Sequence, residues 1–114
     1  MVQFRVVFSE RVNDVQLFRL LGERVRTYIR EAEPGTTVYN WFISDGGHFL
    51  NEDRYADDAA FLRHIKNAQA QGFYTEFLAV TEVETIQVLG DAGAQVLEAL
   101  AGFSPRSYRG VGEL

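Results

Sequence analysis

The 114-residue sequence contains no cysteine and only two prolines. Without cysteine there is no disulfide, no thiolate nucleophile and no cysteine-based zinc site. The apolar runs fall well short of the roughly 20 residues that a membrane-spanning helix needs, so we expect no membrane partner. The N-terminal stretch MVQFRVVFSERV carries Arg5 within its apolar run and no small-residue cleavage site. This pattern favours a strand over a signal peptide, and we expect a cytoplasmic protein.

Positive charge is also sparse. The basic residues are ten arginines and one lysine, scattered along the chain, and the net charge is −5. Binding to a nucleic-acid backbone requires a contiguous basic face, because clustered cations are needed to neutralise the phosphates. The sequence therefore favours a small molecule or another protein over nucleic acid as the partner.

The overall composition is typical of a globular protein, with 46% hydrophobic and 24% charged residues. A chain of this length is long enough to bury a core but short for two independent cores. We therefore expect a single domain over residues 1–114.

Periodicity predicts the elements of the first half. Apolar side chains alternate along residues 2–8, which indicates a half-buried strand. A helix follows with Asn13 as its N-cap, and it ends before Pro34 because the residue preceding proline is kept out of the helical region. Residues 36–44 and 48–55 are rich in β-branched and aromatic residues and are separated by Asp-Gly-Gly, which predicts a hairpin with a two-residue loop.

Helices and strands also follow one another in the second half. Asp57 opens an acidic first turn of a helix that carries His64 and ends near Gly72. We then expect a short amphipathic helix, the strand EVETIQVLG, a brief helix over residues 92–101 and a final strand after Phe103. The order βαββαβ followed by αβ predicts an α+β, ferredoxin-like sandwich with an antiparallel sheet and helices on one face.

With a two-residue loop, the alternation of the hairpin divides its side chains between the two faces of the sheet. We expect the helices to cover the face that carries Val38, Asn40, Phe42, Phe49, Asn51, Asp53 and Tyr55. The opposite face would carry Tyr39, Trp41, Ile43, His48, Leu50, Glu52 and Arg54. This second row is too apolar for the surface of a small monomer, so we expect a homodimer joined through the sheet.

Several motifs occur in a characteristic order. Glu33-Pro34-Gly35 follows the first predicted helix, Tyr39 lies in the next strand, and Asp53-Arg54-Tyr55-Ala56-Asp57 leads into the helix of His64. In these motifs the sequence resembles the antibiotic biosynthesis monooxygenase (ABM) superfamily of dimeric α+β barrels, over roughly residues 2 to 90. At the position of the family's usual Glu, this sequence has Asp53, which is one methylene shorter.

The resemblance implies an ABM-like small-molecule enzyme. More specifically, it implies a cofactor-independent monooxygenase acting on an aromatic or polyketide-like substrate. Such an enzyme takes a proton from an acidic carbon, and the carbanion gives an electron to oxygen directly, so no cofactor is expected. The alternative is a non-catalytic ligand-binding or interaction homodimer of the same fold. Haem-degrading relatives carry an Asn on the first strand, and VQFRVVF has none, which disfavours that role.

The candidate catalytic residues are His64, Asp53 and Asn40. The expected faces place Asn40 and Asp53 beneath the helix of His64, where each unpaired polar group costs about 1–3 kcal/mol. A nearby carboxylate would make His64 a general base near neutral pH, with Asn40 or Tyr55 holding a developing oxyanion. A structural polar network built from the same residues is the alternative interpretation.

The candidate substrate-binding residues are Tyr55, Phe42, Phe49, Asn51, Tyr74 and Phe77. An aromatic-lined pocket suits a flat apolar ligand, and the same side chains also serve to pack a core. His48 is expected on the opposite sheet face from His64, so we expect no metal site.

Overall fold

The computed structural model describes residues 2–44 and 46–112. Its sheet has the order β2-β3-β1-β4-β5 and consists of β1 (Phe4–Val12), β2 (Thr36–Ile43), β3 (His48–Tyr55), β4 (Thr81–Gly90) and β5 (Arg106–Tyr108). The pairs β1–β3, β1–β4 and β2–β3 are antiparallel, whereas β5 pairs parallel with β4. The predicted antiparallel sheet is therefore correct for the first four strands, and β5 makes the sheet mixed.

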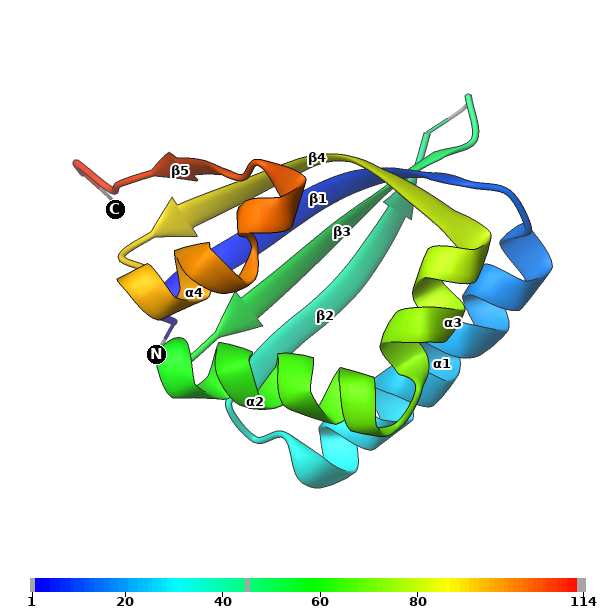
Figure 1. Ribbon diagram of the computed structural model, residues 1–114, viewed down its shortest axis with the longest axis horizontal. Helices are drawn as coiled ribbons and strands as arrows, with labels where there is room; N and C mark the ends of the chain where they lie inside the picture. Colours follow the sequence, from blue (N-terminus) through cyan, green and yellow to red (C-terminus); the bar gives the residue numbers. More distant parts are fainter. Residues whose placement is uncertain (1, 45, 113–114) are drawn as a thin grey trace.

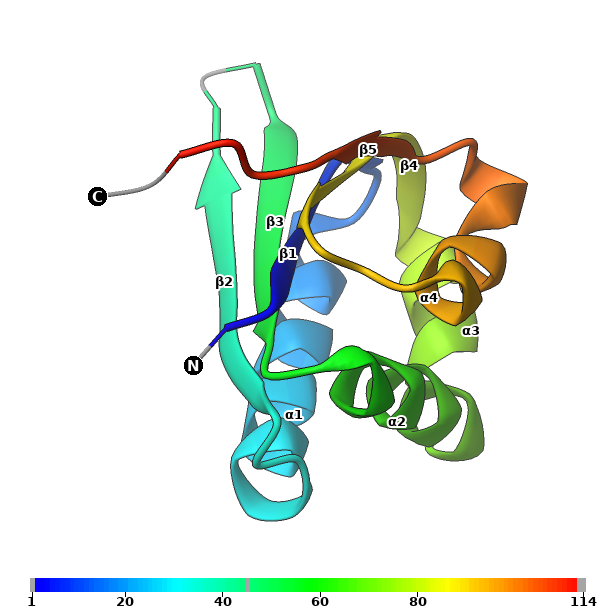
Figure 2. The same ribbon diagram turned by 90° about the vertical axis from the view of Figure 1, so that its left-hand side faces the viewer.

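The helices of the described residues lie on one side of this sheet (Figure 1). They are α1 (Val15–Ala32), α2 (Asp58–Ala70), α3 (Phe73–Val80), α4 (Ala94–Ala99) and the 3₁₀ helix η1 (Ala101–Phe103). Figure 2 shows the labelled helices on one side of the strands and none of them on the other side. The predicted α+β, ferredoxin-like fold is confirmed, and the sheet of the single chain is open. None of the helices described is long and apolar enough to cross a bilayer.

Aspartates fix the starts of the two longest helices. The side chains of Asp14 and Asp57 each accept a backbone N–H from three residues further along, at 3.0 and 2.8 Å. The prediction for Asp57 is confirmed, whereas the predicted cap at Asn13 is wrong by one residue. The N–H of Asn13 instead donates to the backbone oxygen of Val80 at 2.9 Å, so this residue still belongs to the end of the strand region.

The hairpin between β2 and β3 has a three-residue loop. The N–H of Ser44 donates to the backbone oxygen of His48 at 2.8 Å and closes a loop over positions 45–47, of which Asp45 lies outside the described residues. Gly47 has a φ of +78°, the left-handed conformation that completes such loops. Because this loop is one residue longer than expected, odd residues of β2 pair with odd residues of β3, as Tyr39 does with Asp53.

The predicted faces of β2 are consequently exchanged. The helix-covered face carries Tyr39 and Trp41, followed at the strand end by Ile43, and the open face carries Val38, Asn40 and Phe42. The predicted faces of β3 are correct, with Phe49, Asn51, Asp53 and Tyr55 beneath the helices and His48, Leu50, Glu52 and Arg54 on the open face. The open face is therefore less apolar than expected, although Phe42 and Leu50 remain 52% and 40% exposed there.

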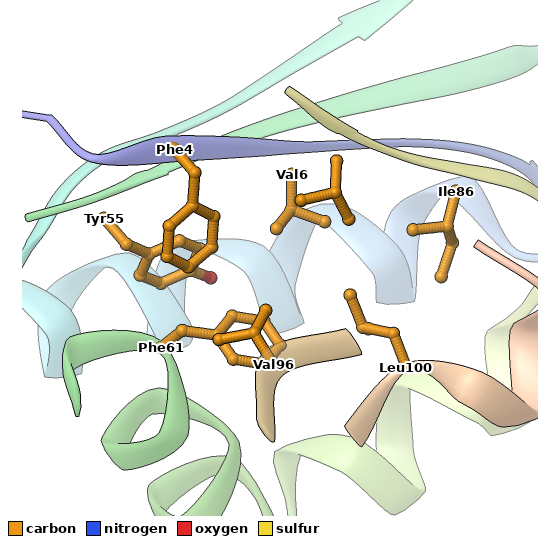
Figure 3. Close-up of a cluster of buried hydrophobic side chains, with 8 residues drawn as sticks. Phe4, Val6, Tyr55, Phe61, Ile86, Val96 and Leu100 are labelled. Carbon is orange, nitrogen blue, oxygen red and sulfur yellow. The ribbon is translucent and has the colours of Figure 1, made fainter. Parts of the chain in front are cut away.

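The largest core cluster lies between the sheet and helices α2 and α4. Figure 3 shows Phe4 and Tyr55 of the sheet directed toward Phe61 of α2, with ring centroids 6.0 and 5.2 Å from that of Phe61. A second cluster joins α1 to α3 through Leu21, Val25, Ile29 and Phe73. These two clusters hold the helices over the sheet on either side of a cavity.

Candidate active site

A cavity of about 160 Å³ lies between the covered face of the sheet and the helices. Its wall is largely aromatic, with Tyr39, Trp41 and Tyr55 from the sheet and Phe18, Phe61, Phe73 and Phe77 from the helices. The exposed lining residues Gln69, Leu78 and Ala99 place its mouth among α2, α3 and α4. Besides the tyrosines and Gln69, the polar side chains in the wall are His64 and Asp53.

His64 is held in this wall by a buried carboxylate. It lies on the inner side of α2 and is 9% exposed, and its Nδ1 is 2.7 Å from Oε1 of Glu33. A carboxylate accepts only, so Nδ1 is the nitrogen that carries the proton in the neutral ring. Nε2 is then the basic nitrogen, and it is free to meet a ligand in the cavity. The tilted rings of Tyr39 and Tyr55 flank the imidazole, with centroids 5.9 and 5.8 Å away.

Glu33 owes its position to the end of α1. Its backbone N–H caps the helix by bonding to the oxygen of Ile29, and the following Pro34 forces the chain to leave the helix. The side chain is 3% exposed and accepts hydrogen bonds from Thr36 at 3.0 Å and Asn67 at 3.2 Å as well as from His64. Burial acts to raise the pKa of Glu33, but the hydrogen bonds and the charge of His64 outweigh it and lower that pKa. Glu33 is therefore an ionised group that orients His64.

Asp53 lies on β3 between Tyr39 of β2 and Val6 of β1. It is 3% exposed, and its Oδ2 accepts the hydroxyl of Tyr55 at 3.1 Å. Burial raises the pKa of Asp53 to about 7, although the charge of His64 opposes the shift. The carboxylate hydrogen-bonded to His64 belongs to Glu33 and not to Asp53. Asp53 is therefore a separate polar group in the cavity wall.

Two further polar side chains lie beneath the helices beside Asp53. Glu10 and Asn51 are completely buried, and among the described residues neither side chain has a hydrogen-bond partner. Burial, together with the nearby charge of Asp53, raises the pKa of Glu10 to about 8. A buried polar row thus runs along the sheet beneath the site, and Asp53 is its member that lines the cavity.

The structure gathers some of the predicted site residues and separates others. His64, Asp53, Tyr55, Tyr74 and Phe77 all line the cavity. Phe49 and Asn51 lie on the covered face as predicted but outside the cavity wall, and Phe49 packs instead on Phe18 with ring centroids 4.7 Å apart.

The predicted positions of Asn40 and Phe42 are wrong. Both lie on the open face of the sheet, because the three-residue loop reverses the alternation of β2. Asn40 pairs with Glu52, and its exposed side chain points away from the helices. Neither residue reaches His64, so the oxyanion-binding role expected for Asn40 has no geometric basis.

Sequence reasoning missed three important residues of the site. Tyr39 and Trp41 were assigned to the opposite face, and Glu33 was recognised only as part of the Glu-Pro-Gly motif. A signal for Glu33 exists, since it continues the buried stripe of Val25 and Ile29 at four-residue spacing.

Comparisons with known proteins identify the fold. No family model and no curated protein matches the sequence. MupZ from Pseudomonas fluorescens superposes with a TM-score of 0.84 and 15% identity, over 97% of this chain and 92% of that chain. The cofactor-independent oxygenase SnoaB from Streptomyces nogalater gives a TM-score of 0.68 and 14% identity, over 82% and 97% of the two chains.

A candidate antibiotic biosynthesis monooxygenase from Caulobacter crescentus is similar to the same degree. Its TM-score is 0.67 at 16% identity, over 81% of this chain and 92% of that chain. The protein therefore has the fold seen in ABM-type structures, in agreement with the resemblance found in its motifs. At these identities the likeness establishes the fold, and the chemistry has to be argued from the cavity.

The contact between Trp41 and Gly22 shapes one wall of the cavity. Trp41 is the only tryptophan of the sequence, and the guanidinium of Arg26 lies 5.3 Å from its ring centroid. A Cβ on Gly22 would overlap the Trp41 ring. We predict that Gly22→Ala displaces this ring and destabilises the fold by about 1–3 kcal/mol. Tryptophan fluorescence and urea unfolding measure both effects.

Gly102→Ala is the matched control, because a Cβ there meets no atom within 4 Å. The control should keep the emission spectrum and stability of the wild type. Indistinguishable behaviour of the two variants would contradict the tight packing of Trp41 on α1.

The raised pKa of Glu10 predicts a pH-dependent stability. Between its unfolded value near 4.5 and its folded value of about 8, the folded state holds a proton that the unfolded state releases. Stability therefore falls as the pH rises through this window. Glu10→Gln removes this titration. Between about pH 5 and pH 8, the free energy of unfolding of the variant should therefore fall by less than that of the wild type, with a difference on the order of 3 kcal/mol.

Urea unfolding at the two pH values measures the difference. The exposed Glu98 on α4 provides the control, since Glu98→Gln should retain the wild-type pH dependence. An equal loss of stability in wild type and Glu10→Gln would show that Glu10 is ionised in the folded protein.

Proposed function

We propose that the protein is a small-molecule enzyme, specifically a cofactor-independent monooxygenase for an aromatic or polyketide-like substrate. The observation that carries the proposal is the His64–Glu33 pair in the wall of an aromatic cavity. Glu33 supplies a fixed negative charge that holds the tautomer of His64 and supports the imidazolium formed when Nε2 takes a proton. His64 is thus the general base, and Glu33 is the residue that positions it.

The size and lining of the cavity support an aromatic substrate. A volume of about 160 Å³ is close to the 150 Å³ of an engineered apolar cavity that binds benzene. One ring therefore fits inside, and a larger polycyclic substrate extends through the mouth near Leu78. Flat rings find favourable edge and face contacts with the aromatic wall.

The proposed reaction needs only the substrate and molecular oxygen. His64 removes a proton from an activated CH₂ group, and the carbanion transfers an electron to O₂, after which the two radicals combine to a peroxide. Protonation of the peroxide, loss of the second hydrogen as a proton and cleavage of the O–O bond give a carbonyl and one water. The balance is R₂CH₂ + O₂ → R₂CO + H₂O. The shared fold with SnoaB, described as a cofactor-independent oxygenase, supports this reaction type.

His64→Gln is the direct test of the proposed base. With dithranol, an aromatic ketone that has an acidic CH₂ group, we expect the variant to lose at least about 100-fold in the rate of oxygen consumption. An oxygen electrode measures the rate, and circular dichroism checks that the variant is folded. His48→Gln is the matched control and should keep the wild-type rate, because His48 lies on the open face beside Glu84.

A folded His64→Gln variant with an unchanged rate would overturn the role of His64. The second candidate, a non-catalytic ligand-binding homodimer, predicts that neither the wild type nor either variant accelerates oxygen consumption above the rate without protein. The cavity accounts for ligand binding in both candidates, so turnover is the quantity that separates them.

We also propose that two copies pair through the open face of the sheet. Phe42 and Leu50 are large apolar side chains exposed on this face, and burying them against their symmetry mates would remove them from water. Phe42→Asp should therefore shift a dimer to monomer in sedimentation at low micromolar concentration. Leu20→Asp, on an exposed position of α1, should remain dimeric. A wild type that sediments as a monomer would contradict the proposal.

A further inference from the structure

The polar row beneath the helices consists of Glu10, Asn51 and Asp53, which lie along one face of the sheet and leave polar atoms without hydrogen-bond partners among the described residues. Asn51 pairs with Phe8 and Asp53 with Val6 across β1 and β3, so Glu10, two residues beyond Phe8, lies diagonal to Asn51 on the same face. Both carboxylate oxygens of Glu10, both amide atoms of Asn51 and Oδ1 of Asp53 have no hydrogen-bond partner among the described residues. Buried polar atoms of this kind require partners, and because Asp53 alone of the three residues lines the cavity, it is the one that a polar group of a ligand can reach.

The charges around Asp53 restrict its ionisation. The titratable groups that act on it are His64 from α2, Tyr55 and Glu52 from β3, and Glu33. The charge of Asp53 acts in turn on Glu10 of β1 and Tyr39 of β2. Glu52 is on the open face with Arg54, and His64 is already hydrogen-bonded to Glu33. Helices α1 and α3 contribute apolar side chains and Tyr74 to the cavity wall, and no lysine or arginine belongs to that wall.

Burial in a region of low dielectric constant disfavours the charged form of a carboxyl group, and Asp53 is 3% exposed. We propose that Asp53 is the ligand-binding group on the sheet side of the cavity and that its protonated carboxyl donates a hydrogen bond to a neutral oxygen acceptor of the ligand. Burial, together with the nearby Glu52 and Glu33, disfavours release of that proton. The inference rests on the proposed function in taking the cavity as the substrate site.

The assignment defines the class of ligand as a neutral aryl ketone or a similar aromatic carbonyl compound. A carboxylate ligand would bring a further negative charge to a wall that already contains Asp53 and offers no lysine or arginine. The carbonyl oxygen would accept the proton of Asp53 while the ring lies among the aromatic side chains. Burial supports this state, because it raises the pKa of Asp53 to about 7 and that of Glu10 to about 8.

The test compares acetophenone with benzoate, which have the same ring and similar size but differ in charge. Quenching of Trp41 fluorescence, with calorimetry as a second readout, measures binding at about pH 6. We expect acetophenone to bind at least about tenfold more tightly than benzoate. Asp53→Asn, which keeps an N–H donor, should bind acetophenone within about threefold of the wild type, whereas Asp53→Leu should lose about tenfold or more.

Because Asp53→Leu can perturb folding, the titration of the wild type provides an independent measurement. In ¹³C NMR of protein labelled at aspartate, the Asp53 signal, assigned by its loss in Asp53→Asn, should titrate near neutral pH. Titration of Asp53 near the ordinary value of about 4 would overturn the proposal. Equal or tighter binding of benzoate would overturn it as well.

These outcomes are separate from those of the oxygenase test. If acetophenone binds with the expected pattern but the protein consumes no oxygen, the proposed reaction is wrong and the role of Asp53 is supported. Turnover that depends on His64, together with tight benzoate binding, would overturn the role of Asp53 alone.

Discussion

The hydrogen bond between Glu33 and His64 joins parts of the fold that are distant in the sequence. Glu33 lies at the end of α1. Its carboxylate is hydrogen-bonded to His64 and Asn67 of α2 and to Thr36, the first residue of β2. A buried carboxylate is stable only when several donors surround it, so these elements have to meet at one point. Their meeting fixes how α2 sits over the sheet, and with it the space that becomes the cavity.

Each side of the cavity combines aromatic side chains with a buried polar group, His64 on α2 and Asp53 on β3. The helices supply Phe18, Phe61, Phe73 and Phe77, which shield the interior from water. The sheet supplies the carboxyl of Asp53, with Glu10 and Asn51 behind it, at a cost in stability that the apolar clusters on either side offset. In the proposed complex the ligand lies between Asp53 of the sheet and His64 of α2, with its ring among aromatic side chains from both sides.

Much of the fold could be predicted from local chemistry. The strand alternation, the cap at Asp57 and the helix end before Pro34 each depend on a few neighbouring residues, and they agree with the structure. The faces of β2 could not be obtained in this way, because they depend on whether the loop after Ser44 has two or three residues, and Asp-Gly-Gly is compatible with both. That single residue moved Asn40 out of the predicted site and Tyr39 into it.

The acidic residues of the site were missed for a different reason. Glu33 and Glu10 both continue buried apolar rows, Glu33 at helical spacing after Ile29 and Glu10 at strand spacing after Phe8. Taken alone, a glutamate at the end of such a row is more simply assigned to the surface, because charged residues are rarely buried without partners. Only the tertiary arrangement reveals that His64 partners Glu33 and that Asp53 lies near Glu10.

The order of the strands has a consequence for how the protein acquires its cavity. The first strand of the chain is central in the sheet, and its two neighbours, β3 and β4, begin at His48 and Thr81. Local hairpin formation can join β2 to β3 early, but β1 gains its second neighbour only through a contact that spans most of the sequence. The cavity wall likewise draws on residues from Val6 to Phe103. The binding site is therefore complete only when β1 has paired with β4 and the residues after β4 have packed against the sheet.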